Sequence, residues 1–129
     1  MRATVLLPFA LCAAQIAGAE ELLPNFSHDD ALTCMAYSVV DVELNGTQDP
    51  AKFAQEMVFW SRLIAMKATE ADQTAFETRF AETLAFYRDP KFEGDAPATP
   101  EEVDEILTGT AKMCWFEALA AEGGPYEGQ

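Results

Sequence analysis

Basic residues are scarce in this chain. Among 129 residues only 8 are Lys or Arg, whereas 22 are Asp or Glu, and the formal net charge is −14 at pH 7. A surface of this charge repels nucleic acid and anionic lipid. The composition therefore argues against nucleic-acid-binding classes, and we expect no nucleic-acid partner.

Histidine is scarcer still, since the chain has only His28. Serine and cysteine hydrolases need a base, usually a histidine, beside the nucleophile. The motifs GxSxG, HExxH and CxxCH and a phosphate-binding loop are also missing from the sequence. We expect His28 to be a solvated residue in the first turn of a helix, and we predict neither an enzyme nor a cofactor.

Long apolar segments are missing except at the N-terminus. That run follows Arg2, is shorter than the roughly 20 residues that span a bilayer, and ends at Ala17-Gly18-Ala19. A positive residue, a short apolar run and a small-x-small site are typical of a secretory signal peptide. We predict a signal peptide at residues 1–19 and an exported single domain at 20–129, in the periplasm or outside the cell. The alternative is a buried N-terminal helix.

Cysteines are few, and their spacing carries information. Cys12 lies in the predicted signal peptide, which leaves Cys34 and Cys114 in the mature chain. No CxxC motif or Cys/His cluster points to redox catalysis or zinc. In an oxidising compartment such a pair favours a disulfide over the alternative, two free buried thiols.

Four segments show helical spacing of apolar residues, and no segment shows sustained period-two alternation. Each begins with a residue that caps a helix, in two cases followed by proline. Glycine, asparagine or proline follows the first, third and fourth segments. We predict helices at about 28–44, 50–68, 70–88 and 100–121, started by Ser27, Asp49, Thr69 and Thr99, and a frayed tail at 126–129.

The fold class that these segments predict is all-α, an antiparallel four-helix bundle. Short connections favour an up-down-up-down order, in which the first and last helices are antiparallel. Cys34 and Cys114 then lie about 10 Å from the same end of the bundle. The sequence therefore predicts a disulfide between the first and last helices that closes the bundle.

The richest polar stretch, Asp41 to Asp49, is a weak candidate for a metal site. Oxygen ligands from Asp41, Glu43, Asn45 and Asp49, with Gly46 between them, partly match a helix–loop–helix calcium loop. Lys52 stands where that loop needs a bidentate Glu. The same residues also serve as helix stop and start signals, so we predict no metal at this stretch.

Two further sets of residues are candidates for binding a ligand or partner. Adjacent aromatic pairs on a helix point about 100 degrees apart, so one member of each pair could line a groove instead of the core. Acidic residues crowd the start of the fourth helix, where they suit the helix dipole or could bind a basic partner. The candidates are Trp60, Tyr87, Trp115, Glu101, Glu102 and Glu105.

The segment Thr33-Cys34-Met35-Ala36-Tyr37 opens a first helix in a small exported helical chain with one later cysteine. In this it resembles the periplasmic acid-stress chaperones, although the cysteines here are farther apart and the chain is longer. The resemblance implies a bundle that is stable at neutral pH, loosens in acid and binds unfolding client proteins.

We therefore expect an exported, non-enzymatic helical protein that binds a protein partner or a small apolar ligand. The alternatives are an acid-stress chaperone-like protein and a carrier of hydrophobic ligands. No membrane span is expected in the mature chain.

Overall fold

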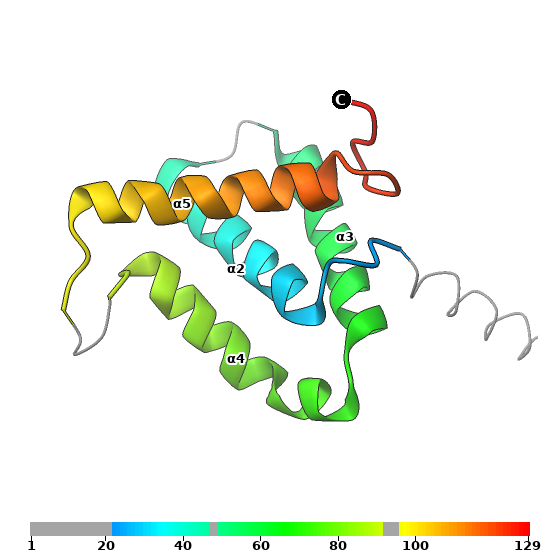
Figure 1. Cartoon of the computed structure of the whole chain (residues 1–129), viewed down its shortest axis with the longest axis horizontal. Coiled ribbons are helices and arrows are strands. Elements are labelled where there is room, and N and C mark those ends of the chain that lie inside the picture. Colours follow the sequence, from blue (N-terminus) through cyan, green and yellow to red (C-terminus); the bar gives the residue numbers. More distant parts are fainter. Residues whose placement is uncertain (1–21, 47–48, 92–95) are drawn as a thin grey trace, which may run out of the picture.

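One helix organises the fold, and the other three pack on it. The computed structural model describes residues 22–46, 49–91 and 96–129, so the predicted signal peptide and Cys12 lie outside the described residues. The central helix is α2 (His28–Asn45), and it contacts α3 (Pro50–Lys67), α4 (Glu70–Arg88) and α5 (Pro100–Cys114). A short π-helix, η2 (Trp115–Leu119), continues α5 (Figure 1).

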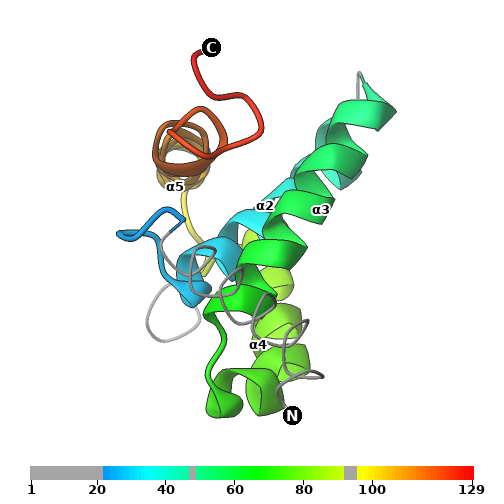
Figure 2. The same ribbon diagram turned by 90° about the vertical axis from the view of Figure 1, so that its right-hand side faces the viewer.

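Successive helices reverse direction. Figure 1 shows α2 and α4 running the same way, with α5 returning across α2 in the opposite sense. Figure 2 shows α5 on one side of α2 and both α3 and α4 on the other. The described residues contain no strand, only an isolated β-bridge between Lys91 and Pro97. The predicted all-α, antiparallel four-helix bundle is confirmed.

The predicted helix starts are confirmed by their caps. Capping boxes begin α2, α4 and α5, and the Asp49 side chain accepts hydrogen bonds from two backbone N–H groups at the start of α3. Each cap satisfies N–H groups that have no partner inside the helix, which stabilises it by about 1 kcal/mol. After α2 the chain turns at Gly46 with φ +76°, a conformation that glycine adopts without strain.

The core gathers around α2 because that helix is buried on several sides. Ala31 and Ala36 are fully buried, and their small side chains allow neighbouring helices to approach closely. From α3, Trp60 is fully buried, with its ring centroid 6.1 Å from Phe26 and 5.1 Å from Phe59. Burial of these aromatic rings is a large part of what holds α3 to α2.

The disulfide joins Cys34 of α2 to Cys114 at the end of α5, as predicted. Its Cα atoms are 5.7 Å apart, the two residues are 80 positions apart in sequence, and both side chains are buried. The first and last helices are therefore tied together covalently.

The C-terminal part differs from the sequence prediction in two ways. The fourth helix does not continue as an α-helix to residue 121, because the N–H of Ala120 bonds the carbonyl of Trp115, five residues back. This wider turn buries both Ala118 and Leu119. The predicted frayed tail at 126–129 is also wrong, since Tyr126 is buried and its N–H donates to the Leu119 carbonyl at 2.8 Å.

The tail returns because the chain reverses sharply after η2. A Cβ atom on Gly124 would overlap the carbonyl oxygens of Ala118 and Leu119, so only glycine fits this close approach. The turn sets the Tyr126 ring against Trp115, with centroids 5.7 Å apart. The last residues are therefore part of the domain.

Candidate functional site

A groove of about 440 Å³ lies where the end of α2, the start of α3 and the junction of α5 with η2 meet. Aromatic rings from all three elements line it, namely Tyr37, Phe53 and Trp115. The π-helix borders it directly, and π-type turns occur often at functional sites. We treat this groove as the candidate functional site.

Acidic side chains dominate the polar part of the groove. Asp41, Asp49 and Glu56 line it, against a single basic residue, Lys52. The Asp41 and Asp49 residues come from the predicted polar stretch, at the end of α2 and the start of α3. A groove with aromatic walls and three carboxylates suits a ligand that has both an apolar and a cationic part.

Glu56 and Tyr126 form a hydrogen-bonded pair beside the groove, and both have shifted pKa values. The Tyr126 hydroxyl donates to Glu56 Oε2 at 2.9 Å. Burial raises the pKa of the Glu56 carboxyl above its usual range, although the hydrogen bond from Tyr126 acts against this shift. Burial, together with the hydrogen bond to Glu56, raises the pKa of Tyr126 to about 12. Shifted pairs of this kind cluster at functional sites.

Sequence reasoning missed Glu56, Lys52 and Tyr126. The missed signal was an aromatic residue placed directly after Gly123-Gly124-Pro125, which can turn a tail back onto the domain. Glu56 stands on the helix face between Phe53 and Trp60, and nothing in its spacing distinguishes it from an ordinary solvated glutamate.

The predicted aromatic candidates lie in different places. Trp115 lines the groove, whereas Trp60 is fully buried in the core and its Nε1–H has no acceptor among the described residues. Tyr87 is buried, and its hydroxyl lies 2.9 Å from the Thr110 hydroxyl, which links α4 to α5. The structure therefore brings only Trp115 of these three to the groove.

The predicted acidic candidates stand exposed on the first turns of α5, away from the groove. Glu102 Oε1 accepts from the Thr99 N–H at 2.9 Å and so completes the capping box. Glu101 and Glu105 border, with Lys112, an open depression of about 470 Å³ that has no aromatic lining. Their place in the fold fits the favourable interaction of acidic groups with a helix N-terminus.

The weak metal candidates have separate partners. Glu43 forms a bidentate pair with Arg88, with N–O distances of 2.9 and 2.7 Å. Asn45 donates from its side chain to Asp41 Oδ1 at 2.8 Å, and Asp49 caps α3. Their side chains thus serve helix ends and helix contacts.

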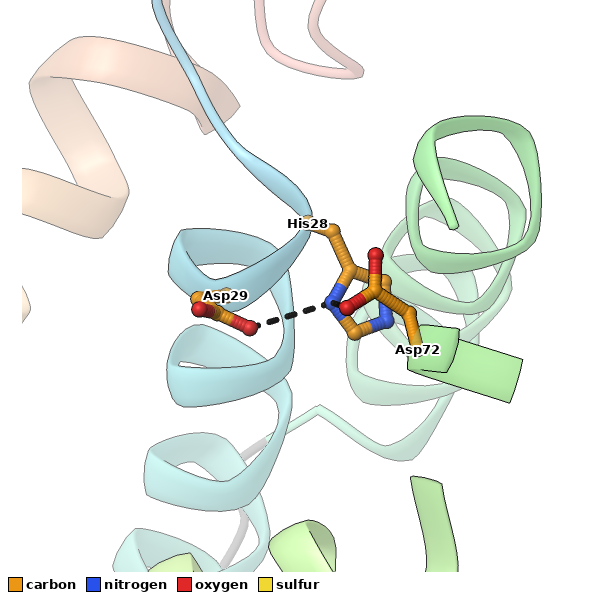
Figure 3. A group of neighbouring side chains, drawn as sticks. All are labelled: His28, Asp29 and Asp72. Atoms are coloured by element: carbon orange, nitrogen blue, oxygen red, sulfur yellow. Dashed lines mark hydrogen bonds and ion pairs between the residues drawn. The ribbon is translucent and has the colours of Figure 1, made fainter. Parts of the chain in front are cut away.

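His28 lies in a second cluster, between the starts of α2 and α4 (Figure 3). The expectation that it is solvated is wrong: its side chain is only 6% exposed. It is buried because α4 packs along α2 and covers the first turn. Its Nδ1 faces Asp29 Oδ1 at 3.2 Å and Asp72 Oδ1 at 3.9 Å.

The three ligand atoms of this cluster lie within 4.8 Å of one another, the one such grouping among the described residues. Arg79 already supplies positive charge there, since its guanidinium donates to Asp29 Oδ1 at 3.2 Å and to Asp72 Oδ1 at 3.0 Å. The cluster thus serves as an ion-pair network between α2 and α4. His28 also borders a largely apolar depression of about 250 Å³, and a role for this depression in carrying a hydrophobic ligand stays a prediction.

Within the described residues, every helix is too short or too polar to span a bilayer. Comparisons of the chain with protein-family models, curated proteins and solved structures find no match. The groove and its chemistry are therefore the basis on which a function is proposed.

Proposed function

We propose that this is an exported, non-enzymatic binding protein that holds a partner or a small ligand in the groove between α2, α3 and the α5–η2 junction. The observation that carries the proposal is the groove itself, about 440 Å³ in volume and lined by aromatic and acidic side chains from three helices. The disulfide between Cys34 and Cys114 supports export, because such bonds persist in oxidising compartments.

The protonation of Tyr126 and the hydrogen bonding of Ser38 favour a binding role over a catalytic one. Tyr126 keeps its proton because its pKa is raised to about 12, so it does not act as a base near neutral pH. The Ser38 hydroxyl donates its proton to the Cys34 carbonyl at 2.8 Å instead of to a carboxylate of the groove. The groove therefore offers recognition groups without an activated nucleophile.

The test is to fill the groove. Ala111 lines it, so Ala111→Trp places a large ring in the space that a ligand would use. Thr108→Trp is the matched control, since Thr108 is exposed on α5 and borders the open depression near Glu105 instead of the groove. Circular dichroism would first establish that both variants are folded.

Native mass spectrometry and affinity capture from periplasmic extract would then compare the two variants with the wild type. We expect a bound molecule or captured partner that survives Thr108→Trp and is lost in Ala111→Trp. Equal binding by both variants would show that the groove is not the binding site.

A second candidate, an acid-responsive protein that exposes binding surface at low pH, is supported by the contact between α2 and α4. Only Tyr87 of α4 is buried, and ion pairs of Asp29 with Arg79 and of Glu43 with Arg88 cross the contact. The hydrogen bond from Arg88 holds the pKa of Glu43 below its usual range. Backbone and side-chain hydrogen bonds at Thr69, with His28 and Arg79 nearby, lower the pKa of Asp72.

The sign of this effect follows from linkage. A carboxyl group with a lowered pKa in the folded state stabilises the fold above its unfolded pKa, near 4, and this contribution is lost as the pH falls through the folded pKa. Glu56, with its raised pKa, acts in the opposite direction. Circular dichroism and client-aggregation assays between pH 7 and pH 2 test this candidate. Unchanged structure and no suppression of aggregation in acid would remove it.

A further inference from the structure

We propose that the groove binds a small organic amine that carries an apolar group, with the ligand ammonium taking the place of the Lys52 side chain. The proposal rests on the groove being a binding site, and it adds the chemical class of the ligand. Three features carry it: free carboxylate oxygens, an ammonium already present beside an aromatic ring, and a spacing of carboxylates that does not suit a metal ion.

The groove carboxylates each use one oxygen in an internal hydrogen bond. Asp41 Oδ1 accepts from the Asn45 side chain, Asp49 Oδ1 accepts from two backbone N–H groups of α3, and Glu56 Oε2 accepts from Tyr126. The second oxygen of each has no donor in the described parts of the chain. None of the three carboxylates pairs with a basic side chain within 4.0 Å there. Lys52 lies near enough to lower the pKa of Glu56 but forms no ion pair with it, so a ligand cation that reaches these oxygens would find a weaker competitor than a paired lysine.

Lys52 carries an ammonium group at the edge of the groove, beside the Tyr126 ring that bonds the groove residue Glu56. Its Nζ lies 5.4 Å from the centroid of the Tyr126 ring, within the range of a cation–π interaction. Its side chain is exposed, so it can move into water when a ligand enters. An ammonium has compact charge and three donors, which suits carboxylate oxygens on one side and a ring face on the other.

The remaining walls favour an apolar body on the same ligand. Tyr37, Phe53 and Trp115 are partly buried, and each contributes ring surface that a ligand would cover. Removing such surface from water favours binding, so an aromatic or aliphatic group adds to the affinity of the ammonium.

A divalent metal ion fits less well. Metal binding requires several ligand atoms around one point, and among the described residues only His28, Asp29 and Asp72 bring three such atoms within 4.8 Å. The groove carboxylates do not converge in this way. An extended organic cation does not need convergence, because it can satisfy one carboxylate with its ammonium and cover the rings with its body.

The test uses three probes of similar size with the processed, disulfide-bonded protein. Phenethylamine is cationic, 2-phenylethanol is neutral, and 3-phenylpropionate is anionic. Binding would be measured by titration calorimetry and by backbone amide shifts in NMR spectra. We expect phenethylamine to bind about tenfold or more tightly than the alcohol, because hydrogen bonds to charged groups are the stronger ones, and the acid not to bind. Calcium chloride at millimolar concentration should not displace the amine.

Two variants make the test specific to the groove. Glu56→Gln keeps an acceptor for Tyr126 but removes the charge, and we expect it to weaken amine binding about tenfold. Lys52→Gln removes the competing ammonium and should strengthen amine binding several-fold. Glu105→Gln, on the exposed face of α5, is the control and should leave the affinity unchanged.

Equal binding of the amine and the alcohol would overturn the inference but leave the groove as a binding site. Failure of all three probes would also overturn it, and the proposed function would then still be decided by the Ala111→Trp comparison. Displacement of the amine by calcium would overturn it in favour of a metal site.

Discussion

Removal of the disulfide between Cys34 and Cys114 should cost much of the stability of the domain. The bond joins residues 80 positions apart. In the chain-entropy model, a disulfide that closes a loop of that length lowers the entropy of the unfolded chain and so destabilises the unfolded state by about 4.5 kcal/mol. Small domains have a total stability of about 5 to 15 kcal/mol, so the reduced protein should be marginal.

The assay is urea unfolding followed by circular dichroism, with and without a reducing agent. Reduction of the wild type leaves both sulfur atoms in the core, whereas the double variant Cys34→Ala/Cys114→Ala also removes buried volume. We expect the reduced protein to lose about 4 kcal/mol of unfolding free energy and the double variant somewhat more. A loss below 1 kcal/mol on reduction would refute the reasoning that this bond closes the bundle.

Three further predictions rest on named contacts, and a fourth rests on the predicted signal peptide. Because the pKa of Asp72 is lowered in the folded protein, the unfolding free energy should fall as the pH drops below about 4. The variant Asp72→Asn should show a smaller fall. An unfolding free energy that stays flat or rises in urea titrations at acid pH would contradict this. Gly124→Ala should destabilise the fold by about 2 kcal/mol in urea unfolding, because the added methyl overlaps two carbonyl oxygens, and wild-type stability would count against that packing. Tyr126→Phe should cost about 1 to 2 kcal/mol by removing the donor to a half-buried carboxyl, and an unchanged midpoint would show that this bond is not important. Export predicts that the intact mass of the secreted protein corresponds to cleavage between Ala19 and Glu20, and a mass that includes residues 1–19 would contradict the signal peptide.

The helix starts and the disulfide could be predicted because their causes are local or topological. Ser27, Thr69 and Thr99 each stand three residues before an acidic residue, and this spacing is itself the capping geometry. The pairing of Cys34 with Cys114 followed from the direction of the first and last helices. Neither inference required knowledge of how the side chains pack.

The groove could not be predicted because it depends on how the helices pack and on a change of helix type. A hydrogen bond from Ala120 to Trp115 widens one turn after Cys114, and this rotates the following residues relative to α-helical spacing. The turn at Gly124 then brings Tyr126 back onto Glu56. The sequence alone gives no periodic signal for such a π-type turn.

The burial of His28 was missed for a related reason. Its place in the first turn of a helix predicts exposure if that helix lies at the edge of the bundle. Here α2 is central, so the start of α4 covers it and its ring joins the carboxylates of Asp29 and Asp72. Which helix occupies the centre of the bundle depends on how the packing surfaces of all four helices fit together.

The central claim is that the groove beside η2 is the binding site, and intermolecular NOE measurements with phenethylamine test it most directly. The account predicts contacts between the ring of the amine and the side chains of Phe53 and Trp115, with loss of these contacts in Ala111→Trp. Contacts instead at the apolar depression beside His28 and Phe76, or none at any amine concentration up to the millimolar range, would contradict it.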